Sequence, residues 1–271
     1  MRSVIYVLDT YKEIENMVET DFRVQYSWVE DARASLTEYA DHQDIDIVFL
    51  NEGNYYLERF DSLVRDVQSG RKDSWKMHKF LRMYTFADSD YDYAYFVDLD
   101  TIVLDKNKNL DSLIDTDKIY FNRFGRGRRN DKKINPMRKQ RIRRYCKDPS
   151  KAIHFSTGFM CCSKKHCEMI LSFLESKNLN LLTESGVETL LLDITGFNDE
   201  DRPRGLFTDE VLMNMAINSG ILDDSQAGAS EAGICEEFWI DNPNSALFHV
   251  ISNRFDKQRV FFLLNEFLKL K

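Results

Sequence analysis

A single apolar stretch that ends on two closely spaced acids constrains this chain more than any other feature. The stretch runs from Tyr93 to Asp100, with acids at Asp98 and Asp100, and an apolar run resumes at 101–104. Such a run, bounded by polar residues, predicts a buried strand of an α/β sheet. Ligands of open α/β sheets bind outside the carboxyl ends of the strands, and residues i and i+2 of an extended chain project to the same side. We therefore expect Asp98 and Asp100 to face one site.

The two carboxylates predict a site for a divalent metal ion. Two carboxylates a few ångströms apart repel each other unless a cation lies between them or one of them stays protonated. Oxygen ligands of this kind suit Mg²⁺ or Mn²⁺, which bind through one or two carboxylates together with the phosphates of a substrate. The alternative is a turn at the end of a strand whose acids face water, because short Asp-x-Asp strings arise by chance in a chain with 45 acids.

The apolar strand, the Asp-x-Asp string and Thr101-Ile102-Val103 together resemble the DxD motif of GT-A glycosyltransferases. In that family the acids hold the divalent ion that bridges the diphosphate of a nucleotide-sugar. The resemblance implies that Asp98 and Asp100 bind Mn²⁺ or Mg²⁺ and that Asp98 also contacts the nucleotide-sugar. A rival resemblance is to haloacid-dehalogenase phosphatases, whose DxDx(T/V) motif uses its first Asp as nucleophile. That motif usually sits on the first strand and has Thr or Val where this chain has Ile102.

The composition fits one large α/β domain. Of 271 residues, 43% are hydrophobic and 13% are aromatic, which is enough to build a core and excludes wholesale disorder. No apolar run reaches the roughly 18 residues of a membrane-spanning helix, and the first residues enter a strand without a small-residue cleavage site, so we expect no signal peptide. Five cysteines without a repeating spacing predict reduced thiols in the cytoplasm. A zinc site at Cys161-Cys162-x4-Cys167 is the alternative, but it lacks the CxxC spacing.

The order of the predicted elements indicates a Rossmann-like, mostly parallel central sheet flanked by helices. Strands are expected at 3–8, 46–50 and in the stretch that ends on Asp98, and helices at 28–42, 55–68 and 74–86. This alternation is typical of one half of a doubly wound fold. We predict a single GT-A-like catalytic domain over 1–271, which divides into a nucleotide-binding half (1–105), a basic insertion (123–147), an acceptor or sugar half (154–255) and a C-terminal helix (256–271).

Three segments match donor-binding parts of GT-A enzymes. The turn Asp9-Thr10-Tyr11 is similar to the turn that opens many members of glycosyltransferase family eight, where it meets the base and ribose of a UDP-sugar. Lys79 and Arg82 lie on a basic helix where GT-A enzymes contact the diphosphate. Ser156-Thr157-Gly158 resembles the small-residue strand that contacts the transferred sugar. The alternatives are a helix cap at Asp9 or Thr10 and a solvated basic face.

Two later segments extend the resemblance to family eight and its relatives. Asp209 and Glu210 match a D-(Q/E)-x-x-h-N motif, with Asn214 at its end, in which one acid approaches the anomeric carbon or orients a sugar hydroxyl. The same acids also suit the positive end of a helix. His249 is placed like the His that completes the metal shell, with Lys257 or Arg254 as a phosphate contact, and a core histidine is the alternative. The family-eight string H-x-x-G-x-x-K-P-W does not occur in this sequence.

The segment 123–147 is strongly basic. It holds twelve Lys or Arg and one acid, a net charge of +11 that leaves −19 for the rest of a chain whose total is −8. Such a block is often an interaction arm, and it predicts a platform for an anionic acceptor, namely nucleic acid such as modified DNA, a phosphate-bearing glycan or a lipid-linked acceptor at an anionic membrane. A solvated insertion without a partner is the alternative. The acceptor-binding candidates are Arg126, Arg128, Arg129, Lys132, Lys133, Arg141, Arg143 and Arg144.

Taken together, the motifs predict a metal-dependent glycosyltransferase that uses a nucleotide-sugar, above all a UDP-sugar. The likeness to family eight suggests retention at the anomeric carbon. Two alternatives from other classes stay open: a phosphatase with Asp98 as nucleophile, and a nucleic-acid-binding module that acts through 123–147. We expect a cytoplasmic protein, with peripheral membrane contact as one option. Residues 223–233, rich in small and acidic residues, predict a flexible loop of the kind that closes over a nucleotide.

Overall fold

The central sheet is built around two strands that are buried on both faces. β1 (Ser3–Leu8) and β3 (Tyr93–Asp98) pair in parallel, and all of their residues are buried except Asp98, which is partly exposed. Continuous apolar runs are typical of such strands, because a layer covers each face of the sheet. The structure is a computed structural model, and it describes residues 1–9, 28–50, 79–123, 155–176, 209–222, 225–237 and 244–250.

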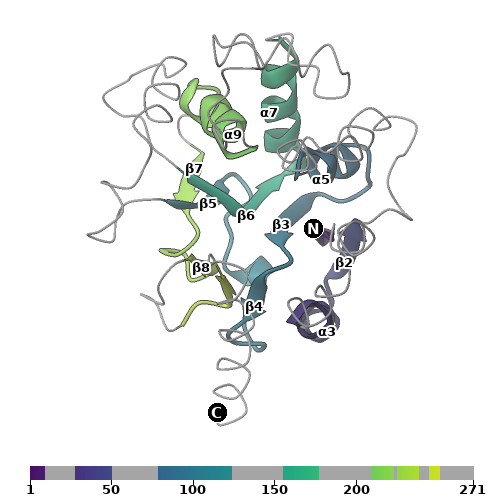
Figure 1. Cartoon of the computed structure of the whole chain (residues 1–271). Coiled ribbons are helices and arrows are strands. Elements are labelled where there is room, and N and C mark those ends of the chain that lie inside the picture. Colours follow the sequence, from purple (N-terminus) through teal and green to yellow (C-terminus); the bar gives the residue numbers. More distant parts are fainter. Residues whose placement is uncertain are drawn as a thin grey trace, which may run out of the picture.

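Six strands form the main sheet, in the order β2-β1-β3-β6-β5-β7 (Figure 1). β2 (Asp46–Leu50) runs parallel to β1, and β5 (Ile119–Arg123) runs parallel to β7 (Gln226–Gly228). β6 (Phe155–Ser163) is antiparallel to both of its neighbours, β3 and β5. With one reversed strand, the described sheet is mostly parallel, as the sequence predicts. This is also the architecture that the GT-A resemblance implies.

Two different layers cover the faces of this sheet. α5 (Lys79–Ala87), α7 (Lys164–Ser176) and α9 (Asp209–Asn218) lie on one side, and α3 (Trp28–Gln43) lies on the other with a small second sheet (Figure 1). Successive side chains of a strand point to opposite faces. Ala94 and Phe96 therefore pack with the three helices, whereas Tyr95 and Val97 pack with α3 and the small sheet. Asp98 continues the row of Phe96, so it faces the helix side.

The small sheet brings a distant part of the chain to the end of β3. It contains β4 (Thr101–Val103), β9 (Leu247–His249) and β8 (Cys235–Glu237) in that order. The chain turns at Leu99 and Asp100, so β3 and β4 belong to different sheets. Thr101 pairs with His249 in an antiparallel ladder, and the Val250 amide donates to the Asp100 carbonyl at 2.9 Å. These bonds hold His249 beside the Asp-x-Asp string.

Most of the predicted elements are confirmed where the structure describes them, but the loop predicted at 223–233 is wrong in part. Gln226–Gly228 form strand β7 at the edge of the main sheet. Small residues have little preference for strands, and here backbone pairing with β5 decides the conformation. The predicted helices at 55–68 and 256–271 lie outside the described residues, as does the basic insertion after Arg123.

Two further expectations concern the membrane and the cysteines. Among the described helices, none is both long enough and apolar enough to cross a membrane. The described cysteines, Cys161, Cys162, Cys167 and Cys235, are buried and form no disulfide within the described residues. Burial raises the pKa of the Cys161 and Cys162 thiols well above the usual value, which keeps these thiols protonated and unreactive. They pack as small apolar side chains within the two core clusters.

Candidate functional site

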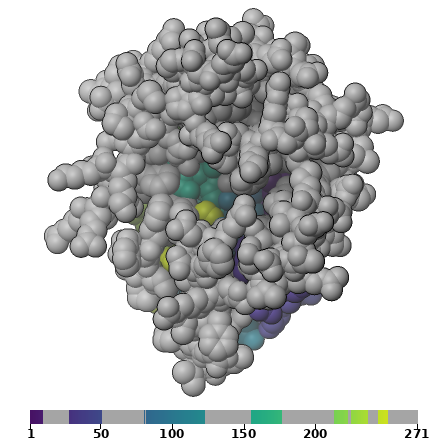
Figure 2. All heavy atoms as spheres, viewed as in Figure 1, coloured from purple at the N-terminus to yellow at the C-terminus, as the bar shows by residue number. Residues whose placement is uncertain are grey.

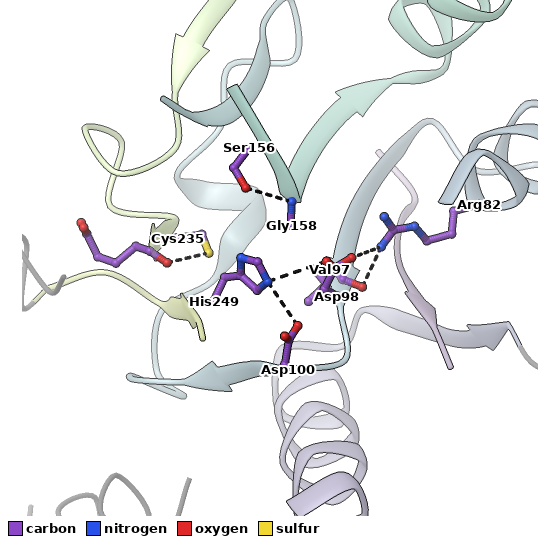
Figure 3. Close-up of polar contacts among 9 residues, drawn as sticks. Arg82, Val97, Asp98, Asp100, Ser156, Gly158, Cys235 and His249 are labelled. Carbon is purple, nitrogen blue, oxygen red and sulfur yellow. Dashed lines mark hydrogen bonds and ion pairs between the residues drawn. The ribbon is translucent and has the colours of Figure 1, made fainter. Parts of the chain in front are cut away.

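Asp98, Asp100 and His249 form a cluster at the carboxyl end of β3 (Figure 3). His249 Nε2 lies 3.2 Å from Asp100 Oδ1 and 3.7 Å from Asp98 Oδ2. Each residue offers one ligand atom, and the three atoms lie within 4.8 Å of one another. Around an octahedral ion with bonds of about 2 Å, neighbouring ligand atoms are about 3 Å apart. The spacing and the donor set of two carboxylates and one imidazole therefore fit a divalent ion such as Mn²⁺ or Mg²⁺.

Gly158 makes room for the imidazole ring of the cluster. A Cβ added to Gly158 would lie 1.9 Å from His249 Cε1 and 2.1 Å from His249 Nδ1. The pairing of β6 with β5 shifts register at this level, between Phe121 and Arg123, and irregularities of this kind often occur next to functional sites. The Gly158 amide donates to Ser156 Oγ at 3.3 Å. The segment that resembles a sugar-contacting strand thus lies beside the Asp-Asp-His cluster (Figure 3).

Arg82 lies against the first acid of the cluster. Its Nη1 donates to the Val97 carbonyl at 2.8 Å and to Asp98 Oδ1 at 3.2 Å (Figure 3). Arg82 is only 2% exposed, and a buried guanidinium needs a charged partner to offset its lost hydration. The two oxygens of Asp98 therefore have different neighbours, because Oδ1 faces Arg82 and Oδ2 faces His249.

Asp9 is buried and has a charged partner on α3. Arg33 donates from Nε and Nη2 to the two carboxylate oxygens of Asp9, at 2.7 Å each. This bidentate geometry is the strong form of an arginine–carboxylate pair, and hydrogen bonding to Asp9 raises the pKa of the Arg33 guanidinium above its usual value. The Asp9 amide also donates to the Leu50 carbonyl at 2.9 Å. A contact of Asp9 with a base or ribose stays a prediction.

The structure describes only part of the predicted site. α9 begins at Asp209 and includes Glu210, but the side chains of these two acids and of Lys79 lie outside the described part. Asn214 has a structural partner: its Nδ2 donates to the Phe155 carbonyl at 2.8 Å, and its Oδ1 accepts from the Phe155 amide at 2.7 Å. The remaining candidates lie outside the described residues: Thr10, Tyr11, Arg126, Arg128, Arg129, Lys132, Lys133, Arg141, Arg143, Arg144 and Lys257.

Asn122 is a buried polar residue that belongs to none of the motifs recognised in the sequence. It lies on β5 at the register shift and is 3% exposed. Neither its Nδ2 nor its Oδ1 has a hydrogen-bond partner within the described residues. A buried amide without partners costs about 1–3 kcal/mol. The sequence signal for this residue is weak, since it consists only of an Asn that follows the apolar run Ile119–Phe121.

A small cavity borders the cluster on the helix side of the sheet. Its free volume is about 20 Å³. Among the described residues, Arg82, Ser156 and Thr157 form the polar part of its wall, and the other described lining residues are apolar. The aromatic side chains of that wall are Phe80, Phe96, Phe121 and Phe155, and the aliphatic ones are Met83, Met160, Met213 and Ile217. Figure 2 shows a hollow on the viewed face, with atoms of the 155–176 stretch (teal) and of the 244–250 stretch (yellow) inside it.

Comparison with known proteins yields structural similarities only. No protein-family model matches the chain, and no curated protein matches it. One similar solved structure is a glycosyltransferase involved in glycosylation of the major capsid of PBCV-1, with 10% identity, a TM-score of 0.48 and coverage of 97% of this chain and 100% of that one. Another is the galactosyltransferase LgtC in complex with donor and acceptor sugar analogues, with 13% identity, a TM-score of 0.48 and coverage of 97% and 95%.

A third similar structure is mouse xyloside xylosyltransferase 1, with 12% identity, a TM-score of 0.43 and coverage of 93% of this chain and 98% of that one. The three identities are far below the level at which function transfers between proteins. The function of this chain is therefore argued from the residues of the site.

Proposed function

We propose that this chain is a glycosyltransferase that needs a divalent metal ion, takes a nucleotide-sugar as donor and transfers the sugar to an anionic acceptor. The observation that carries the proposal is the Asp98–Asp100–His249 cluster at the carboxyl end of β3. Ligands of α/β sheets bind at this end of the strands. Two carboxylates and one imidazole suit Mn²⁺ or Mg²⁺, which commonly bind in proteins together with substrate phosphates.

The residues of the cluster have distinct roles in this proposal. Asp98, Asp100 and His249 hold the ion, and Arg82 orients Asp98 by holding Oδ1, so that Oδ2 remains directed at His249. The bound ion would supply Lewis-acid stabilisation of the charge on the leaving diphosphate. Gly158 admits the imidazole because it has no side chain.

The donor site extends from the cluster over neighbouring segments. Ser156, Thr157 and Gly158 would contact the transferred sugar, and Asp98 would contact the nucleotide-sugar as well as hold the ion. We assign the diphosphate to Lys79, Arg82 and Lys257, whose positive charges would stabilise it electrostatically. The uridine of a UDP-sugar is assigned to Asp9, Thr10 and Tyr11. Asp209 or Glu210, at the start of α9, orients a sugar hydroxyl or approaches the anomeric carbon. The configuration of the anomeric carbon is proposed to be retained during transfer.

The acceptor is proposed from the charge of 123–147 alone. Twelve Lys or Arg among 25 residues favour a polyanion, either DNA with modified bases or a phosphate-bearing glycan or lipid. The phosphatase alternative has less support, because its motif sits on a first strand and β3 follows two other described strands, β1 and β2, along the chain. The nucleic-acid module alternative depends on the same basic block and does not account for the Asp-Asp-His cluster.

Calorimetric titration tests the donor site. UDP, GDP and dTDP are titrated into the protein with Mn²⁺ and again with EDTA, and the UDP titration is repeated on Asp100→Ala. The proposal expects UDP binding that requires both the metal and Asp100. Asp90→Ala is the matched control, because Asp90 is an exposed acid that precedes β3 at its amino end. Absence of binding by all three nucleotides would overturn the donor assignment.

A second experiment separates the alternatives and the acceptor classes. A phosphatase would form a phosphoryl-enzyme intermediate that Asp98→Asn abolishes, and a nucleic-acid module would bind DNA with steep salt dependence while ignoring nucleotides. Transfer is measured from UDP-sugars to DNA and to phosphoglycans, and the anomeric configuration of the product is read by proton NMR. Replacement of Arg141, Arg143 and Arg144 by Gln is expected to weaken acceptor binding more than donor binding.

A further inference from the structure

The cavity of about 20 Å³ shares its polar wall with the metal cluster. Arg82 lines the cavity and also contacts Asp98 Oδ1 at 3.2 Å. Thr157 lines it next to Gly158, which lies under the His249 ring. Phe96, which also lines the cavity, precedes Asp98 by two residues on the same face of β3. A group that binds at the cluster therefore has this cavity as its immediate neighbour on the helix side.

The remaining part of the wall that the structure describes is hydrophobic. Aromatic rings and methionines surround the cavity, among them Phe121, Phe155, Met160 and Met213. A water molecule in a cavity is stable only with two to four polar partners, and the described apolar side of this wall, away from Arg82, Ser156 and Thr157, offers none. A hydroxyl that pointed at the apolar side would lose its hydrogen bonds to water without replacement. A cavity of about 20 Å³ has room for roughly one water molecule, so a small apolar group such as a methyl group can enter it. The methyl group gains from leaving water, and methionine side chains can adjust their shape around it.

From this arrangement we infer that the cavity receives a methyl group carried by the donor sugar, as found in 2-acetamido sugars and in 6-deoxy sugars. The inference rests on the proposed function, because it names the sugar class for the same donor site. The polar wall formed by Arg82, Ser156 and Thr157 faces the polar part of the substituent or the ring hydroxyls. The apolar wall receives the methyl group, so the enzyme selects against donors with a hydroxyl in its place.

Matched pairs of nucleotide-sugars test the inference by calorimetry in the presence of Mg²⁺. UDP-N-acetylglucosamine is compared with UDP-glucose, UDP-N-acetylgalactosamine with UDP-galactose, and UDP-6-deoxyglucose with UDP-glucose. The methyl-bearing member of at least one pair is expected to bind about tenfold or more tightly than its hydroxyl counterpart, the usual discrimination of a hydrophobic pocket. The pair that shows the preference identifies the position of the methyl group on the sugar.

Cavity-filling variants connect the preference to this cavity. Met213→Phe and Ile217→Phe place a larger side chain in the wall and are each expected to remove most of the preference. Met213→Leu keeps a side chain of similar size and is expected to retain it. The affinity for UDP, which has no sugar to place in the cavity, shows whether a variant has kept its fold and its nucleotide site. If both Phe variants lose UDP binding, saturation-transfer NMR on the wild-type protein decides, because a buried methyl group must receive more saturation than the sugar ring protons.

The outcomes separate the inference from the proposed function. Failure of the wild-type protein to bind UDP, GDP or dTDP overturns the proposed function itself. Binding of UDP without a preference in any pair overturns the inference and leaves the proposed function intact. A preference that survives both cavity-filling variants also overturns it, because another part of the site must then recognise the methyl group. Loss of the preference in the Phe variants but not in Met213→Leu establishes the cavity as the methyl site.

Discussion

The Nε2 atom of His249 lies 3.2 Å from the Oδ1 atom of Asp100, and this contact joins two distant parts of the chain. It depends on the antiparallel pairing of Thr101 with His249 and on the bond from the Val250 amide to the Asp100 carbonyl. The small sheet therefore positions the nitrogen ligand of the candidate metal site, whereas the main sheet positions Asp98. Changes that displace the imidazole should affect the metal site before they affect the main sheet.

Gly158→Ala should weaken metal binding while the protein stays folded. The new Cβ would lie 1.9 Å from His249 Cε1, so the buried imidazole must move away from the two acids. We expect Mn²⁺ affinity, measured by electron paramagnetic resonance titration, to fall about tenfold or more, as is common when the environment of a metal ligand is disturbed. Circular dichroism should report a spectrum like that of the wild-type protein.

Gly228→Ala is the matched control for this experiment. There the added Cβ would lie 1.6 Å from Glu231 Oε2, which is the end of an exposed and flexible side chain that can move aside. We expect Mn²⁺ affinity to stay near the wild-type value. If Gly158→Ala bound Mn²⁺ as tightly as the wild-type protein, His249 would have to be removed from the proposed ligand set.

Arg82→Met should destabilise the protein by about 3 kcal/mol, because removal of one partner leaves the other charge of a largely buried pair without compensation. Arg82 and Asp98 have side chains that are 3% and 17% exposed, and their contact is 3.2 Å. The free energy of unfolding in urea measures the loss. Arg2→Met is the control, since Arg2 and Asp46 are more than half exposed and a surface pair contributes at most about 1 kcal/mol. Equal losses in the two variants would contradict the assignment of Arg82 as the residue that holds Asp98.

Asn122→Leu and Asn214→Leu should change stability in opposite directions. Both side chains are buried, but Asn122 has no hydrogen-bond partner among the described residues, whereas Asn214 bonds to both backbone groups of Phe155. We expect Asn122→Leu to stabilise the protein by about 1 kcal/mol and Asn214→Leu to destabilise it by about 2 kcal/mol or more. Urea unfolding of both variants provides the comparison. A destabilised Asn122→Leu variant would show that the Asn122 amide is paired in solution.

Asp9→Asn should be much more destabilising than Glu30→Gln, although both acids bind the same guanidinium. Asp9 accepts two bonds of 2.7 Å from Arg33 and its side chain is 3% exposed, whereas the side chain of Glu30 is 77% exposed. We expect losses of about 3 kcal/mol for Asp9→Asn and below about 1 kcal/mol for Glu30→Gln. Thermal unfolding measures both, and UDP titration of Asp9→Asn tests its proposed contact with the nucleotide separately. Similar losses in both variants would argue against a buried Asp9–Arg33 pair.

His166 should make the protein less stable as the pH falls. Burial lowers its pKa below the usual 6.5, and nearby Lys165 lowers it further, against an opposing effect of Asp117. The unfolded chain then binds a proton more readily than the folded protein, so stability is full above pH 6.5 and is lost as the pH falls toward the lowered pKa.

Urea unfolding of the wild-type protein and of His166→Gln checks this effect. The measurements run from pH 8 to pH 5, a range of about three pH units that includes the usual His pKa. The wild-type protein is expected to lose more stability than His166→Gln toward low pH, because Gln does not titrate. Parallel pH profiles for the two proteins would rule out the contribution of His166.

The sequence by itself determined the strands and the chemistry at the end of β3. Continuous apolar runs predicted that β1 and β3 are buried on both faces. Because alternate residues of a strand share a face, the sequence also placed Asp98 on the same face of β3 as Ala94 and Phe96. The Asp-x-Asp string and the small residues around Gly158 were recognisable from residue type alone. Such features are local, because they depend on a few neighbouring residues and on the geometry of a single strand.

Only the tertiary structure decided which distant side chains meet. The turn at Leu99 and Asp100 separates β3 from β4, and pairing of β4 with β9 then brings His249 to the acids. The same holds for the contact of Arg82 with Asp98 and for the cavity beside it, since helix and strand residues far apart in the chain enclose that space. These contacts follow from how the strands pair and how the layers pack. A local sequence pattern specifies a strand or a helix, but it does not specify which distant strand or helix becomes its neighbour.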